Sequence, residues 1–286
     1  MTSSEPNPPV GRRSAGAEMK RLRVSKGLKT EEVAVHLGTS TTRVSRMETG
    51  NGRVAIKPKE VESLCDLYGV HDERQRAALL SMFVAAQQPG WWDRYRDVLP
   101  SGLEVLLELE NGAERELAFE LTLIHGLLQT PEYTRAILES SPSVRREDID
   151  DSVALRQRRQ ERVTRTQGPL TVWIILDESA VRRPVGGDDV NLRQRQHLAD
   201  LAELPNVTLQ VIEERKGAHP GMAGPFSVFE FEAQPPVVYV DSPAGNLYLE
   251  KRADVRKFGA TFDLLRASAL DPADTIALLR RATLKE

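Results

Sequence analysis

Apolar positions recur at helical spacing in a short stretch near the N-terminus, Gly27–Gly50. Within it Val33, Ala34 and Leu37 lie at i, i+1 and i+4, which is the spacing of one buried stripe on a helix. Gly38 follows directly, and glycine ends a helix at little cost because it adopts the left-handed conformation. The pattern therefore predicts a short helix followed by a tight turn.

A second short helix is predicted directly after this turn. Ser40 is a favourable N-cap, and the helix carries two inward-facing apolar residues, Val44 and Met47, three positions apart. The remaining positions face outward and carry hydroxyl or guanidinium groups; they are Thr41, Thr42, Arg43, Ser45 and Arg46. A polar helix of this kind, placed after a helix and a tight turn, suits the major groove of DNA, and these five are the predicted base-reading residues.

The flanking sequence completes a small helical domain. Met19 and Leu22 lie at helical spacing within 15–26, and Pro58 is favourable at the first position of a further helix. About five helices are expected within 10–70, which is enough chain for one compact core. Four residues are predicted to hold DNA phosphates, namely Thr30, Ser40, Arg53 and Lys57.

A helical connector is predicted over 71–113. One helix is expected over Asp72–Gln88, a break at Pro89-Gly90, and a second helical run to about Glu110. Trp91 and Trp92 stand at the start of that second run. They are candidates for a nucleic-acid stacking platform, but paired aromatic residues more often fix a helix against a core, and that interpretation is favoured.

From residue 114 the pattern mixes strands with helices. Thr130 and Pro131 predict a helix start, and the almost continuous apolar run Leu170–Leu176 predicts a central strand buried on both faces. Further strands are expected at 118–124, 207–212, 226–231, 237–240 and 247–249, and helices at 145–166, 189–204, 253–268 and 272–282. The predicted fold class is therefore multidomain, with an all-α helix-turn-helix domain over 10–70 followed by a mixed α/β (α+β) domain over 114–286.

Charge divides the chain in the same way. Residues 10–60 hold 12 Lys or Arg and 5 Asp or Glu, so they carry +7, whereas the whole chain carries −3 and its remainder −10. A basic run alone is usually only a solvated surface. Next to a helix-turn-helix pattern, it indicates nucleic-acid binding.

The sequence also indicates a cellular compartment. It has no run of ~18 apolar residues, and its polar, proline-rich start has no apolar segment of a secretory signal. Residues 1–9 are expected to be disordered. Cys65, the single cysteine, lies on an apolar helix face and is expected to be buried. A cytoplasmic, nucleoid-associated protein that does not contact the membrane is expected.

The helix pair resembles the helix-turn-helix of lambda repressor and Cro-type regulators, the XRE family. The residues that carry the resemblance are Gly27, Leu28, Glu31, Glu32, Val33, Ala34, Leu37, Gly38, Ser40, Val44, Ser45, Arg46, Glu48 and Gly50. Two positions depart from the family pattern, because Lys29 replaces the usual capping Thr or Ser, and Thr30 replaces the usual phosphate-contacting Gln. The resemblance implies sequence-specific binding to double-stranded DNA.

The remainder resembles the C-terminal domain of actinobacterial regulators of the WhiJ type. The motifs that carry this resemblance are HGLLQTPEY (125–133), LDESAVRRPVGG (176–187), LAELPNVTLQVI (201–212), GAHPGMAGPFSVFEF (217–231), VVYVD (237–241) and GNLYLEKRADV (245–255). The resemblance implies a transcriptional regulator of development or specialised metabolism whose C-terminal domain senses a signal or binds a small protein encoded by a neighbouring gene. It implies no reaction.

An enzymatic function is the weaker interpretation of this C-terminal part. Asp177 and Glu178 follow a strand, with Arg182 and Arg183 close behind. Titratable candidates elsewhere are His125, His197 and His219, the last within a glycine- and proline-rich loop over 217–225 that either lines a pocket or forms an ordered turn. No zinc-site spacing, G-x-S-x-G or Walker sequence is present, so no catalytic activity, cofactor or metal is expected.

Three functional hypotheses follow from these patterns. The first is a sequence-specific transcription regulator, and it is expected to form a homodimer because one recognition helix buries too little surface for specific affinity. The second is an antitoxin-like interaction protein that regulates its own operon together with a small partner. The third, the weakest, is a DNA-processing enzyme.

Overall fold

The computed structural model describes residues 8–49, 54–86, 90–100, 102–232, 234–241 and 246–281. The chain divides into two units, Met1–Asp93 and Arg94–Glu286. A helical N-terminal unit is followed by a unit that contains a mixed sheet and helices, which confirms the predicted fold class. Of the tail expected over 1–9, residues 1–7 lie outside the described part, and Pro8 and Pro9 already belong to the first helix.

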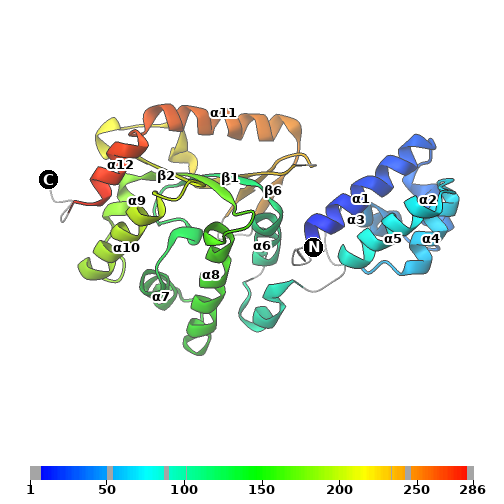
Figure 1. The fold of residues 1–286 in the computed structure, drawn as a ribbon, viewed down its shortest axis with the longest axis horizontal. Coiled ribbons are helices and arrows are strands. Elements are labelled where there is room, and N and C mark those ends of the chain that lie inside the picture. The colour runs from blue at the N-terminus through cyan, green and yellow to red at the C-terminus, as the bar shows by residue number, and fades with distance from the viewer. Residues whose placement is uncertain are drawn as a thin grey trace. The chain divides into compact units, whose positions relative to one another are not determined.

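The N-terminal unit is built from short helices around one core (Figure 1). The described helices are α1 (Pro8–Ser25), α2 (Thr30–His36), α3 (Thr41–Thr49), α4 (Pro58–Leu67) and α5 (Glu73–Ala86). Their buried side chains include Met19, Val33, Val44, Met47, Val61, Leu64, Cys65, Leu79 and Phe83. Apolar residues at helical spacing thus meet in one cluster, as the sequence pattern requires.

The connector expected over 71–113 is divided between the two units. Leu79 and Phe83 of α5 are buried in the N-terminal core, so α5 completes the domain that was expected to end at residue 70. Helix α6 (Leu103–Gly112) instead contributes Leu106 and Leu109 to the core of the C-terminal unit. Both helices carry several apolar residues, and the sequence pattern alone did not indicate which core each one joins.

The second helical run expected after Pro89-Gly90 is interrupted. A 3₁₀ helix, η1 (Trp91–Val98), comes first, and α6 follows only after Pro100 and Gly102. Gly102 has a φ of +86°, a conformation that side chains other than glycine rarely adopt, so the chain turns here instead of continuing as a helix.

The C-terminal unit contains a six-stranded mixed sheet in the order β3-β2-β1-β4-β5-β6. Its strands are β1 (Arg115–Glu120), β2 (Thr171–Asp177), β3 (Val207–Ile212), β4 (Phe226–Glu230), β5 (Val237–Val240) and β6 (Leu247–Leu249). β1, β2 and β3 run parallel, whereas β4, β5 and β6 join through antiparallel pairs. The parallel half requires helical crossovers, which explains why strands and helices interleave in the sequence.

Helices cover both faces of this sheet (Figure 1). The longer ones are α7 (Pro131–Ser140), α8 (Ile149–Thr164), α10 (Asp188–Leu201), α11 (Arg252–Ser268) and α12 (Pro272–Leu279). The shorter ones are η2 (Gly126–Leu128), η3 (Arg146–Asp148), α9 (Glu178–Arg182), η4 (Glu214–Lys216) and η5 (Pro220–Ala223). Helix α11 packs on the face that carries Phe119 and Ile175.

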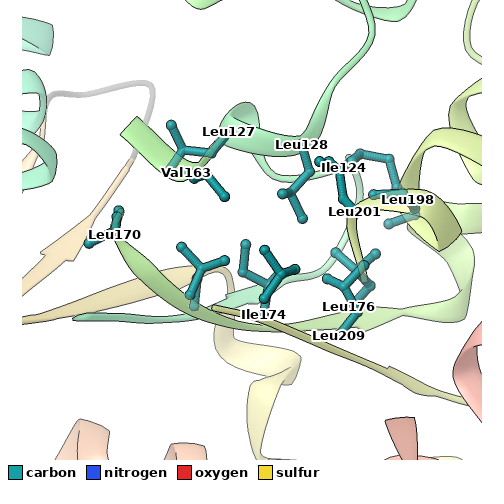
Figure 2. Packing of buried hydrophobic residues seen from close by; sticks show 14 of the residues in the cluster. Ile124, Leu127, Leu128, Val163, Leu170, Ile174, Leu176, Leu198, Leu201 and Leu209 are labelled. Atoms are coloured by element: carbon teal, nitrogen blue, oxygen red, sulfur yellow. The ribbon is translucent and has the colours of Figure 1, made fainter. Parts of the chain in front are cut away.

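Strand β2 is buried on both faces, as its apolar run predicts. Ile174 and Leu176 belong to the larger core, where Figure 2 shows them opposite Leu127 and Leu128 of η2. Ile175 points to the other face and joins the smaller core with Phe262 of α11. Because successive side chains of a strand alternate between faces, a strand covered on both sides must be apolar at almost every position.

Strand β1 begins and ends earlier than expected. The apolar residues at 121–124 suggested a strand over 118–124, but β1 spans Arg115–Glu120 and includes Glu116 and Glu120. Residues 121–124 form the following loop, where Ile124 is buried under η2. The strand boundary was missed because two carboxylates lie inside a strand, against the usual preference for apolar residues.

Candidate nucleic-acid interface

The recognition helix α3 starts where its sequence indicates. The Ser40 Oγ accepts a hydrogen bond from the backbone N–H of Arg43 at 3.2 Å, which is the N-cap interaction. Gly38 has a φ of +61°, and the Thr39 N–H donates to the Ala34 carbonyl at 2.9 Å, which closes the preceding helix. The predicted helix, tight turn and helix are therefore confirmed.

One side of α3 is buried and the other is exposed. Val44 and Met47 lie in the core with 1% and 6% of their surface exposed. Four of the five predicted base-reading residues are exposed, namely Thr41, Thr42, Ser45 and Arg46. The helix thus presents three hydroxyl groups and one guanidinium group to solvent.

The two arginines of α3 have different environments. Arg46 is exposed and has no ion pair within the described part of the chain. Arg43 is half-buried: its Nη1 donates to Glu60 Oε1 at 2.8 Å, and its Nη2 donates to Glu60 Oε2 at 3.1 Å and to the Ala55 carbonyl at 2.8 Å. The sequence pattern treated these arginines as equivalent, because spacing within a helix does not show what a later helix places beside it.

Glu60 accepts hydrogen bonds from the Arg43 side chain and from the backbone. Its Oε2 also accepts from the Lys57 N–H at 2.8 Å, at the start of α4. Burial alone would raise the pKa of Glu60, but the hydrogen bonds from Arg43 and Lys57 outweigh it, so the pKa lies below its ordinary value. The carboxylate therefore stays charged at neutral pH.

The predicted phosphate contacts lie around α3. Thr30 is the first residue of α2, and the Lys57 side chain is exposed directly before α4. Ser40 uses its oxygen as the N-cap but keeps its hydroxyl hydrogen for another acceptor. Arg53 lies outside the described residues. These positions are consistent with phosphate contacts, which stay predictions.

A buried ion pair fixes α3 against α1. Arg23 donates to the two oxygens of Glu48 at 2.6 and 2.9 Å, and also to the Leu28 carbonyl at 2.7 Å. Gly16 allows the two helix backbones to approach, since a Cβ at this position would lie 2.8 Å from the Glu48 carbonyl oxygen and closer still to that of Met47. The position of α3 is therefore determined by backbone contact as well as by the apolar core.

Two further sequence candidates in the N-terminal part are buried. Cys65 is 1% exposed, as expected, and burial raises the pKa of its thiol. Trp92 is also 1% exposed, and its ring meets that of Trp91 edge-on at 5.6 Å between centroids. A buried indole does not serve as a stacking platform for bases, which favours the packing interpretation of this pair.

In the C-terminal unit, the structure brings together Asp177 and His219, which lie far apart in sequence. The His219 Nε2 lies 3.1 Å from Asp177 Oδ2, and its Nδ1 accepts from the Gly221 N–H at 3.2 Å. The other Asp177 oxygen accepts from the Ser179 N–H and caps α9. Both ring nitrogens and the carboxylate are therefore occupied, and the arrangement orders the 217–225 loop.

The other candidate catalytic residues of this unit either form hydrogen bonds or ion pairs within the unit or lie away from the other candidates. Glu178 accepts from the Glu214 N–H at 2.9 Å and lies 3.7 Å from Arg182. Arg183 donates to the Thr122 carbonyl at 3.2 Å. His197 is half-buried on α10, and burial lowers its pKa.

His125 belongs to a buried charge cluster that the sequence did not reveal. Its Nε2 lies 3.2 Å from Glu116 and 4.0 Å from Glu120, and Glu116 is fully buried. Behind it, Arg159 of α8 donates to both oxygens of Glu110. The one signal in the sequence was the pair of carboxylates, Glu116 and Glu120, four positions apart, a spacing that places both on the same face of a strand.

The HGLLQTPEY motif has a structural explanation beside this cluster. Gln129 donates to the Ile124 carbonyl at 2.6 Å and accepts from Arg156 at 2.8 Å, and Thr130 caps α7. Tyr133 accepts from the Ile124 N–H, and Gln194 of α10 bridges Leu128 and Thr130. The polar residues of the motif satisfy the backbone of a buried loop.

The described residues also bear on other classes of site. They contain no group of three or more His, Cys, Asp or Glu side chains arranged to hold a metal ion. Among the same residues, no helix is both long and apolar enough to cross a membrane.

This geometry defines the N-terminal unit as a helix-turn-helix domain, and comparison with known families agrees. A helix-turn-helix domain model matches residues 14–79, a range that ends within α5. A second model, a domain of unknown function (DUF5753), matches residues 103–281, and the chain therefore belongs to the DUF5753 family. No match was found among curated proteins or among solved structures.

Proposed function

We propose that this protein is a sequence-specific transcription regulator that binds double-stranded DNA through α3. One observation carries the proposal: the exposed side of α3 presents Thr41, Thr42, Ser45 and Arg46 on a helix-turn-helix framework, and Arg46 has no ion-pair partner among the described residues. Arginine makes bidentate contacts to guanine, and threonine meets base edges or thymine methyl groups. The +7 charge of residues 10–60 adds attraction to phosphates.

We also propose that the protein is a regulator of the XRE family and the WhiJ type. In this proposal it controls genes of development or specialised metabolism. We propose that the C-terminal unit senses a signal or binds a small partner protein, because its candidate catalytic groups are engaged in internal contacts. Asp177 and His219 bond to each other, and Glu178 bonds to a backbone amide. This arrangement supports a protein without catalytic activity. The helix-turn-helix domain supports a role in the cytoplasm, where the DNA of a bacterial regulator lies.

A homodimer is part of the same proposal. A single helix reads about one half-site, and two half-sites lie about 10 bp apart on one face of the duplex. Sedimentation of the full chain with and without its operator tests this. A dimer on the operator is expected, and a complex with one chain per duplex would refute the assembly.

The binding itself is tested by selection from a random duplex library with the full chain, followed by titration of the enriched duplex. The proposal expects one enriched sequence and a difference of about 10³-fold or more between it and a scrambled duplex. Equal affinity for both duplexes would leave only non-specific binding and would contradict sequence-specific regulation.

A further inference from the structure

If α3 reads DNA as proposed above, its two arginines are not equally available for reading bases. Arg43 and Arg46 lie three positions apart and project from the same region of the helix surface. Their contacts differ, because Arg43 has a carboxylate and a carbonyl as partners, whereas Arg46 has no ion pair within the described residues.

Arg43 already uses the N–H donors that it would need for a bidentate contact to guanine. Bidentate reading of guanine requires two parallel N–H donors, and both Nη atoms of Arg43 already donate to the two oxygens of Glu60. The side chains of Arg43 and Glu60 are 28% and 22% exposed, so the pair is partly shielded from water. Charge-assisted bidentate pairs are among the strongest hydrogen-bonded arrangements in proteins.

The same pair links three segments of the N-terminal unit. Arg43 lies on α3, Ala55 precedes α4, and Glu60 lies in the first turn of α4, where it also accepts the Lys57 N–H. The orientation of α3 and the position of Lys57 therefore depend on one set of hydrogen bonds.

We propose that Glu60 withholds Arg43 from base reading, so that Arg43 is a positioning residue that fixes α3 to the start of α4 and Arg46 is the arginine that reads the sequence. A consequence is that loss of Glu60 releases a cation onto the DNA-facing surface. The released cation broadens recognition, because a flexible arginine finds phosphates and alternative bases.

The test uses the full chain with four variants, each titrated against the selected operator and a scrambled duplex at several salt concentrations. Arg46→Ala should weaken operator binding about 5- to 150-fold and flatten the preference at one base position. Arg43→Ala should weaken operator binding without flattening the preference at any single base position.

Glu60→Gln is compared with Glu62→Gln, which removes the same charge from an exposed position of the same helix. Both variants gain attraction to DNA through charge alone. Only Glu60→Gln should also reduce the ratio of operator to scrambled affinity and steepen the salt dependence by about one unit, the effect of one added phosphate contact. Identical behaviour of the two variants would overturn the proposal.

A measurement on the unsubstituted chain covers the case in which Arg43→Ala does not fold. In spectra of the ¹⁵N-labelled protein, the side-chain Nε signal of Arg46 should shift on addition of operator, and that of Arg43 should keep its free-state position. A large shift of the Arg43 signal, or a flattened base position in Arg43→Ala, would refute the positioning role. Failure of the wild type to prefer any sequence would instead refute the proposed function.

Discussion

Replacement of Glu120 by Gln should remove much of the pH dependence of stability in the C-terminal unit. Glu120 lies at the end of β1, on the face of the sheet opposite α11, and the His125 Nε2 is 4.0 Å from its Oε1. The other charged groups that act on it are Glu116, Asp241 and Arg156. Burial, together with the repulsion from Glu116 and Asp241, raises the pKa of Glu120 to about 7 against the attraction of His125 and Arg156.

The sign of the effect follows from proton binding. In the folded protein Glu120 keeps its proton up to about pH 7, whereas in the unfolded chain it loses the proton near its ordinary value of 4.5. The folded state binds more protons between these values, so the free energy of unfolding falls as pH rises through this window. The pKa of His125 is also raised, because the attraction of Glu116 outweighs the effect of burial, and its contribution is likewise lost as pH rises.

The magnitude is about 1.4 kcal/mol for each unit of pKa shift, which gives about 3 kcal/mol for Glu120 as an upper bound. Its side chain is 23% exposed, so solvent screening reduces this to about 2 kcal/mol. Glutamine has nearly the same shape and does not titrate. The variant should therefore match the wild type near pH 5 and exceed its stability by about 2 kcal/mol near pH 8.

The assay is urea denaturation at several pH values, followed by pulsed hydrogen exchange and mass spectrometry, which reports β1 and β2 peptides separately from the N-terminal unit. Glu114→Gln serves as the control, since Glu114 is an exposed carboxylate directly before β1. The control should follow the wild-type curve. Parallel curves for wild type and Glu120→Gln across the range would show that Glu120 does not titrate with a raised pKa in the folded protein.

Three further predictions concern buried contacts and phosphate binding. Arg159→Met should destabilise the C-terminal unit by about 3–5 kcal/mol in urea denaturation, because Glu110 loses its buried partner. The double variant with Glu110→Gln should recover much of this stability. An unchanged urea transition in Arg159→Met would contradict the prediction. Gly16→Ala should destabilise the N-terminal unit, because a Cβ there would meet the backbone of α3. Gly259 of α11 has open space around it, so Gly259→Ala should stabilise the C-terminal unit by about 0.5–1 kcal/mol. Shifts of equal sign in the two melting curves would contradict the contact at Gly16. Lys57→Ala should weaken operator and scrambled duplex alike and reduce the salt slope by about one unit, and a loss confined to the operator would instead make it a base reader.

The recognition helix could be predicted from the sequence because its determinants are local. Gly38 and Ser40 set the turn and the cap, and the spacing of Val44 and Met47 sets the buried side. The apolar run of β2 was equally informative, since a strand buried on both faces has almost no polar position. Local chemistry and periodicity were sufficient for these elements.

What could not be predicted depends on contacts between distant segments. Arg43 and Arg46 differ only because Glu60, from the next helix, meets the first of them. The bounds of β1 were missed because Glu116 and Glu120, which lie within the strand, are paired by His125 from a later loop. The His219–Asp177 contact joins residues 42 positions apart, and no sequence spacing indicates such a pair.

Base-by-base measurement of operator affinity for the wild type and Arg46→Ala shows whether α3 reads the DNA sequence through Arg46. Each position of the selected duplex is substituted in turn, and the two proteins are titrated on the whole set. We expect the wild type to discriminate between base pairs at several positions. Arg46→Ala should lose this discrimination at one of them and keep it at the others. A uniform loss of affinity over all duplexes would make Arg46 a phosphate contact and would contradict sequence reading by α3 through this residue.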